Sequence, residues 1–318
     1  MKKKMMFLCA FALCIALAVP SFAAQFPVKP VRLIVPFAAG GAADLTARLA
    51  SQVAEKHLGQ PIVIENRAGG GGVTGTSAGA KAAPDGYTLT LLVPGGILNT
   101  FLKKVNYTVE SFAPIVQIVQ EFDVIAAHKS EFADLAALRD YALKNPKAVK
   151  IGVSGAMIYD HLEALILAKS MGVELSPVPF NGSAPAIAAF LGKHVSLCSV
   201  SFAELSEQEK AGEVTFLCVL AEERSPERPD VPTARELGYD VVMGPWRGIV
   251  APKGTPEEIL DIIADAYVKA FNDPEFKKAF EKAELPSNSW LNRKDFTEQV
   301  QTQTVELKKI IDEATAKE

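Results

Sequence analysis

Short apolar runs alternate with helix-like segments along most of the chain, and this alternation restricts the fold more than any other feature. Segments with helical spacing separate several of the runs; residues 43–58 are an example and end at the cap residue Gly59. Alternation of this kind predicts an α/β fold with parallel sheets covered by helices. The predicted strands are RLIVPF (32–37), PIVIEN (61–66), YTLTLLV (87–93), KIGVSG (150–155), VSLCSV (195–200), VTFLCVL (214–220) and RGIVAP (247–252).

The last part of the chain is expected to be entirely helical. Thr255-Pro-Glu-Glu258 combines a capping residue, a first-turn proline and an acidic third position, and Asp273-Pro274 opens the next helix in the same way. The length of the chain fits two domains better than one.

Residues 1–23 have the features of a secretory signal peptide. Lys2–Lys4 precede an apolar stretch over 7–19, and small residues follow at Ser21 and Ala23. The apolar stretch is shorter than the roughly 20 residues of a membrane span, so we expect an exported protein that starts near Ala24. Without the three lysines, 30 basic residues face 37 acidic ones, a balance that disfavours a nucleic-acid partner.

Two cysteines lie beyond this segment, Cys198 and Cys218, each within an apolar run. Buried strand positions are the expected places for both. A disulfide between them is the alternative in an oxidising compartment.

A glycine pair stands at the junction between the first strand and the first helix. Gly40 and Gly41 remove Cβ atoms where unpaired N–H groups and the helix dipole attract anions. Asp44 follows in the first helical turn. One interpretation is an anion site; the other is that Asp44 caps its own helix while the glycines turn the chain.

Two further patterns resemble known motifs but lack their partners. Gly70, Gly72 and Gly75 match a dinucleotide fingerprint, yet the next strand brings no acidic residue for a ribose. We therefore expect this glycine cluster to form a tightly packed loop that borders a pocket.

The second pattern is GVSGA around Ser154, which approaches a nucleophile elbow and precedes Asp160 and His161. A catalytic triad needs histidine on a separate loop, whereas His161 is predicted on the helix that directly follows. We predict no catalytic residue, no cofactor and no metal site, because the remaining histidines are scattered.

Six blocks of the sequence, in order along the chain, carry a family resemblance. Together they resemble the extracytoplasmic solute receptors of tripartite tricarboxylate transporters, also called Bug receptors. The blocks are KPVRLIVPFAAGGAADLTARLA (29–50), LGQPIVIENRAGGGG (58–72), APDGYTL (83–89), VPFNGSAPAIAAFLGKHV (178–195), PDVPTARELGY (229–239) and GPWRGIVAPKGTP (244–256).

The resemblance implies a type II periplasmic binding protein fold, with two α/β lobes that are joined by two crossing strands and close on a ligand. Residues 24–121 and 243–318 would form lobe 1, and residues 122–242 would form lobe 2. A receptor of this kind is expected to work as a monomer in the periplasm.

The same resemblance implies a set of ligand-binding residues. Gly40, Gly41 and Ala42 would cradle a ligand carboxylate, with Asp44 organising waters or capping the helix. The remaining expected contacts are Phe37, Pro94, Gly95, Ser154, Gly155, Phe180, Asn181, Gly182, Ser183 and Arg247.

Three positions depart from the family pattern. Phe180-Asn181-Gly182 replaces a common Tyr-Lys-Gly, and Val200 replaces a common aspartate, which argues against an amino-acid ligand. Arg247 stands where a second aromatic residue is frequent. Its guanidinium could grip the distal carboxylate of a di- or tricarboxylate; an ion pair with an acidic residue is the alternative.

The resemblance thus implies a receptor that captures a small organic acid, expected to be a di- or tricarboxylate, and delivers it to a membrane permease. Two other functions stay open. An exported serine hydrolase would use Ser154, and a ligand sensor for a signalling partner would share the fold and the cleft.

Overall fold

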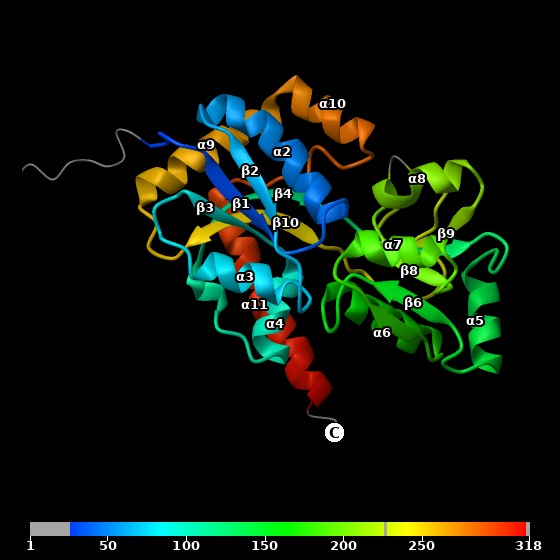
Figure 1. Ribbon diagram of the computed structural model, residues 1–318. Coiled ribbons are helices and arrows are strands. Elements are labelled where there is room, and N and C mark those ends of the chain that lie inside the picture. Colours follow the sequence, from blue (N-terminus) through cyan, green and yellow to red (C-terminus); the bar gives the residue numbers. More distant parts are fainter. Residues whose placement is uncertain (1–25, 226–227, 316–318) are drawn as a thin grey trace, which may run out of the picture.

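The computed structural model describes residues 26–225 and 228–315, which form two five-stranded sheets with helices on their faces (Figure 1). The predicted α/β class is confirmed. The expected signal peptide over residues 1–23 lies outside the described residues. Within the described ranges, none of the helices combines the length and the apolar character that crossing a membrane requires.

The first sheet has the strand order β2-β1-β3-β10-β4. Strands β1, β2 and β3 run parallel, and β10 is antiparallel to both of its neighbours. The strands are β1 (Val31–Val35), β2 (Ile62–Asn66), β3 (Thr88–Leu92), β4 (Phe112–Gln120) and β10 (Trp246–Pro252). We call this sheet and its helices lobe 1.

The second sheet repeats the plan with the order β7-β6-β8-β5-β9. Strand β6 is parallel to β7 and β8, whereas β5 is antiparallel to β8 and β9. The strands are β5 (Val124–His128), β6 (Lys150–Val153), β7 (Ser176–Pro179), β8 (Leu197–Val200) and β9 (Val214–Val219). We call this sheet and its helices lobe 2.

The chain crosses between the sheets twice. It leaves β4 for β5 through residues 121–123 and returns to β10 through the segment that follows β9, where the N–H of Glu121 donates to the carbonyl of Pro245 (3.0 Å). The lobe boundaries at 121/122 and 242/243 remain a proposal, which the placement of the strands supports.

Helix termini follow the capping residues in two places and depart from them in a third. Helix α2 ends at Gly59, which adopts φ 78°, and Asp273 caps α10 by accepting from the N–H of Glu275. The predicted cap at Thr255 is wrong: Pro256 is the N-cap of α9, and the Thr255 hydroxyl donates to Pro252 O instead (2.8 Å).

The helices cover both sheets. Helices α9 and α10 pack on α2, and α11 packs along β4 and α4. In chain order the helices are α2 (Ala42–Leu58), α3 (Val73–Ala80), α4 (Pro94–Leu102), α5 (Leu135–Lys144), α6 (Tyr159–Met171), α7 (Ser183–Leu191), α8 (Phe202–Lys210), α9 (Glu257–Asn272), α10 (Pro274–Lys282) and α11 (Arg293–Thr315), with a 3₁₀ turn at Val109–Ser111.

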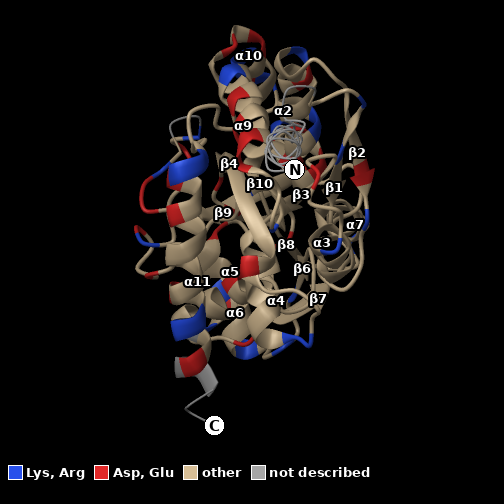
Figure 2. Ribbon diagram, turned by 90° about the vertical axis from the view of Figure 1, so that its left-hand side faces the viewer, with Lys and Arg blue, Asp and Glu red and all other residues tan. Residues whose placement is uncertain are grey.

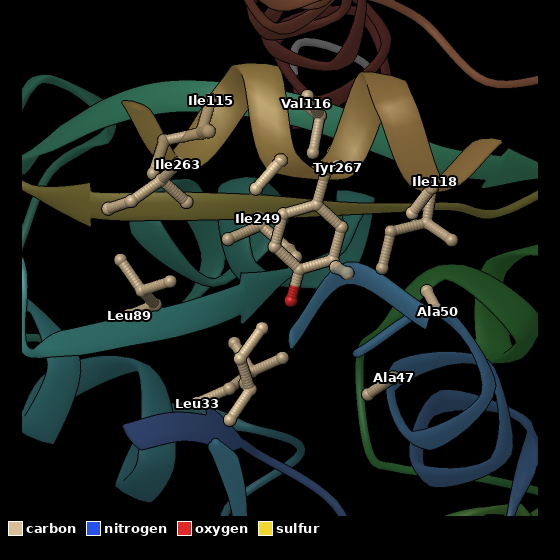
Figure 3. Close-up of a cluster of buried hydrophobic side chains, with 14 of the residues drawn as sticks. Leu33, Ala47, Ala50, Leu89, Ile115, Val116, Ile118, Ile249, Ile263 and Tyr267 are labelled. Atoms are coloured by element: carbon tan, nitrogen blue, oxygen red, sulfur yellow. The ribbon is translucent and has the colours of Figure 1, made fainter. Parts of the chain in front are cut away.

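The core of lobe 1 lies between its sheet and the helices α2 and α9. Tyr267 points from α9 into this core, among the side chains of Leu33 and Ile249 (Figure 3). Its hydroxyl shares a 2.9 Å hydrogen bond with Ser51 of α2, so the buried polar atom has a partner. Charged residues instead mark the outer helices α10 and α11 (Figure 2).

Both cysteines are buried and free. Cys198 lies on β8 and Cys218 on β9, with β5 between these strands. The interpretation as buried strand positions is confirmed.

Candidate functional site

The glycine pair lies where lobe 1 touches lobe 2. Gly41 is the N-cap of α2 in extended conformation, and helical geometry begins at Ala42. A Cβ added at Gly41 would lie 2.5 Å from Ser183 Oγ and 3.3 Å from the N of Ala184 in lobe 2. The missing Cβ therefore lets the second lobe approach the N-terminus of α2.

Asp44 faces its own lobe. One oxygen accepts from the N–H of Gly40 (2.9 Å), Asn66 donates to the other (2.9 Å), and Arg48 donates to both. Burial by itself would raise the pKa of Asp44, but the hydrogen bonds from Arg48, Gly40 and Asn66 outweigh it and lower that pKa. Asp44 thus holds the glycine turn in shape.

A small cavity of about 70 Å³ lies between the two lobes, beside the N-terminus of α2. Its lining includes eight of the expected ligand-binding residues: Phe37, Gly41, Ala42, Pro94, Gly95, Ser154, Ser183 and Arg247. The rest of the expected set, namely Gly40, Asp44, Gly155, Phe180, Asn181 and Gly182, does not line it.

The loop at residues 180–182 forms a contact between the lobes. The carbonyl of Asn181 accepts from the N–H of Ala38 in lobe 1 (3.3 Å), and the N–H of Gly182 donates to the carbonyl of Ser154 (2.8 Å). These bonds place the loop beside the cavity and orient the residues that line it.

A carboxylate already occupies the N-terminus of α2, and it belongs to Glu204 of lobe 2. Glu204 Oε1 accepts from the N–H of Ala42 (2.8 Å) and from the hydroxyl of Ser183, and Oε2 accepts from the N–H of Ser201 (3.1 Å). Ser201 and Glu204 form the capping box of α8. One side chain thus caps its own helix and bonds to the other lobe.

Two backbone donors at the same helix end remain free. Among the described residues, the N–H groups of Gly41 and Ala43 have no hydrogen-bond partner, and both residues border the cavity. These groups and the positive end of the helix dipole can bind an anionic oxygen.

Acidic side chains form another part of the cavity lining. Asp123 lies between β4 and β5 and is 6% exposed, and Asp160 near the start of α6 is 6% exposed. Glu163 is fully buried on the next turn of α6, where Ser199 donates to it (3.3 Å). In the described part of the chain, no lysine, arginine or histidine pairs with any of the three.

Burial raises the pKa values of these three acids. It raises the pKa of Asp123 to about 7, with the charge of Asp160 adding to the rise. Burial also raises the pKa of Asp160 to about 6, although hydrogen bonds from Ser154 oppose this. For Glu163, burial and then the charges of both aspartates raise the pKa well above its usual value.

Arg247 lines the cavity from β10, but its guanidinium forms an ion pair with Glu121. Both side chains are buried, at 6% and 4% exposed. Glu121 follows β4, so the pair joins the strand that leaves lobe 1 to the strand that re-enters it. The ion-pair alternative for Arg247 is thus present in the structure, and a ligand contact stays a prediction.

The arrangement around Ser154 does not resemble a triad. His161 lies on α6 as predicted, and its Nδ1 accepts from the N–H of Met157 (3.2 Å). The N–H of Ser154 donates to Asp160. His161 Nδ1 and Asp160 therefore hold the backbone of this turn.

The glycine cluster at 69–72 packs against both lobes and lies outside the cavity lining. Asn99 donates to the carbonyl of Gly71 (2.9 Å), and the amine of Lys103 donates to Gly70 O (3.1 Å) and to Ala156 O of lobe 2 (2.7 Å). The cluster is thus the tightly packed loop that the sequence predicts, although it does not border this cavity.

Sequence reasoning missed the acidic lining. Val200 lines the cavity in place of the common aspartate, and Asp123 and Asp160 bring acids to other positions of the lining. Asp123 could have been found from its place beside the predicted crossing. For Glu204 the only signal was the Ser-x-x-Glu capping pattern, which predicts a helix start and no contact with α2.

Comparisons with known proteins identify the family and agree with the fold. Residues 46–315 match the model of the tripartite tricarboxylate transporter family receptor. Protein BugT of Bordetella pertussis is 33% identical over 253 residues, 78% of either chain. The structure of periplasmic binding protein BugD matches with a TM-score of 0.85 and 31% identity over 91% of this chain and 99% of BugD. MatC from Rhodopseudomonas palustris, solved with bound malate, matches with a TM-score of 0.82 and 29% identity over 90% of this chain and 100% of MatC. The chain therefore belongs to the tripartite tricarboxylate transporter receptor family, whose members are periplasmic solute-binding receptors.

Proposed function

We propose that this receptor captures a small organic acid in the interlobe cavity and delivers it to the membrane permease of a tripartite tricarboxylate-type transporter. The observation that carries the proposal is the N-terminus of α2, which opens on the cavity and already binds one carboxylate, that of Glu204. A ligand carboxylate would bind there through the free N–H groups of Gly41 and Ala43. Charge-assisted bonds of this kind contribute roughly 1.5–3 kcal/mol each.

The expected di- or tricarboxylate ligand has one argument for it and one against it. Malate is bound in the related MatC structure, which supports a dicarboxylate. The acidic lining of this cavity opposes a second anionic group, because Arg247 is paired with Glu121. We therefore propose an organic acid and leave the number of its carboxylates to the experiment.

The receptor is proposed to act without catalysis, as a monomer, after its signal peptide is removed near Ala23. Within the described ranges the chain crosses between the lobes twice, so hinge opening can admit the solute. The hydrolase alternative would need His161 to activate Ser154, and His161 Nδ1 is engaged with Met157.

Thermal unfolding of the processed protein tests the proposal. The protein is first partly unfolded and refolded to strip any bound solute, and is then heated with mono-, di- and tricarboxylates, amino acids and aromatic acids. A solute at a hundred times its dissociation constant adds about 2.7 kcal/mol and raises Tm by roughly 5 °C. No shift with any acid, together with ester hydrolysis that Ser154→Ala abolishes, would reject the receptor role.

A further inference from the structure

The cavity has an excess of negative charge where it meets the hinge and α6. Asp123, Asp160 and Glu204 line it, and Arg247 is the single cationic side chain in the lining. Because Arg247 pairs with Glu121, it is not available to balance the other acids. A second carboxylate of a ligand would therefore meet acids at close range.

Asp123 is a buried acid of the cavity lining that stands at the crossing between the lobes. It is 6% exposed, and its hydrogen-bond partner is the carboxyl group of Glu163, another buried acid. Asp160, by contrast, accepts from the N–H groups of Ser154 and His161. Two neighbouring buried acids without a counter-charge are costly, and a cationic guest would lower that cost.

Glu163 is a third acid next to Asp123 and Asp160, and it lies outside the cavity lining. It is fully buried next to the two aspartates, and one of its oxygens has no hydrogen-bond partner. Without a guest, these three acids reduce their mutual repulsion by holding protons. A bound ammonium group would take the place of those protons.

We propose that the solute carries a positively charged nitrogen, which lies against Asp123 and Asp160 while its carboxylate binds the N–H groups of Gly41 and Ala43. This inference rests on the proposed receptor function and narrows its ligand to a small zwitterion with an amino and a carboxylate group. Dicarboxylates are then poor ligands, because their second carboxylate faces Asp123.

Calorimetric titration with solutes of matched four-carbon length tests the inference. The stripped, processed protein is titrated at pH 8 with succinate, butanoate, 2-aminobutanoate, 4-aminobutanoate and 1-aminobutane. We expect one of the amino acids to bind at least tenfold more tightly than succinate and than either singly charged compound.

Variants then assign the effect to the acids. Asp123→Asn should weaken binding of the preferred amino acid at least tenfold, and Asp160→Asn should weaken it in the same direction. Asp140→Asn, at an exposed position of α5, is the matched control and should change nothing. Unfolding curves of each variant show that the fold persists.

The outcomes separate this inference from the receptor function. Preferred binding of succinate, with no loss in Asp123→Asn, would overturn the zwitterion and leave an organic-acid receptor. Preferred binding of 1-aminobutane would overturn the carboxylate contact as well. A wild-type protein that binds none of the five, nor any acid of the wider panel, would overturn both proposals.

Discussion

The two sides of the cavity differ in what they offer a ligand. Lobe 1 contributes the N-terminus of α2, Phe37 and the start of α4 at Pro94 and Gly95, which are backbone groups and apolar surface. Lobe 2 contributes hydroxyls and carboxylates, among them Ser183, Asp160 and Glu204. We call the lobe 1 side the backbone wall and the lobe 2 side, with Asp123, the acidic wall. Backbone groups can bind any carboxylate, so selection among organic acids has to come from the acidic wall and from the hinge.

Breaking the ion pair of Arg247 and Glu121 at the hinge should have the largest effect, a loss of folding stability. Arg247→Ala leaves Glu121 buried without a partner, which should lower the free energy of unfolding by about 3–5 kcal/mol. Urea denaturation measures the loss. If Arg247 also grips the solute, affinity falls together with stability.

Arg247→Met combined with Glu121→Gln is the control, because it removes both charges. It should recover most of the stability. An Arg247→Ala variant as stable as the wild type would show that the ion pair does not stabilise the two crossings.

The acidic wall should make the solute-free protein less stable as pH rises. Asp123 and Asp160 titrate near pH 7 and pH 6 in the folded state, but near 3.9 when unfolded. Between pH 4 and 7 the folded state binds more protons than the unfolded state, so the free energy of unfolding falls with rising pH. We expect a loss of roughly 4 kcal/mol between pH 5 and 8.

Denaturation at a series of pH values measures this slope. Asp123→Asn should flatten it, and the exposed variant Asp140→Asn should not. A slope that Asp123→Asn leaves unchanged would show that the acids do not hold protons when the cavity is empty.

The backbone wall is tested at Gly41. In Gly41→Ala the new methyl group lies 2.5 Å from Ser183 Oγ in the closed arrangement, so closure is hindered and affinity for the solute should fall about tenfold. Adding Ser183→Ala removes the nearest atom and should recover part of the loss. Unchanged affinity in Gly41→Ala would mean that the lobes need not approach at this point.

Glu204→Gln gives the smallest expected effect. The amide oxygen can still accept from the N–H of Ala42, but it binds the positive helix end more weakly than a carboxylate does. Affinity for simple acids such as butanoate should rise by about threefold, measured by calorimetry. A decrease would show that Glu204 helps to bind the acid.

Much of the fold could be predicted, because its signals are local. Each of the seven predicted runs contains a strand, and Gly59 marks the end of α2 correctly. Strands β4, β5 and β7 are not among the predicted runs, and two of the four residues of β7 are prolines. The predicted cap at Thr255 is wrong, because its hydroxyl bonds to Pro252.

The site was less predictable, because its contacts join distant parts of the chain. The bond between Ala42 and Glu204 spans 162 residues, and no local pattern encodes it. Family resemblance supplied Gly41, Ser154 and Ser183, which line the cavity. It could not supply Asp123, whose role depends on where the hinge places it.

Lys103 has a consequence for observing the receptor in solution. Its amine donates to Ala156 across the lobes, and that bond has to break whenever the lobes separate. The rate at which an acylating reagent modifies Lys103 should therefore follow the fraction of open molecules, so that opening can be measured on the native chain without an engineered label.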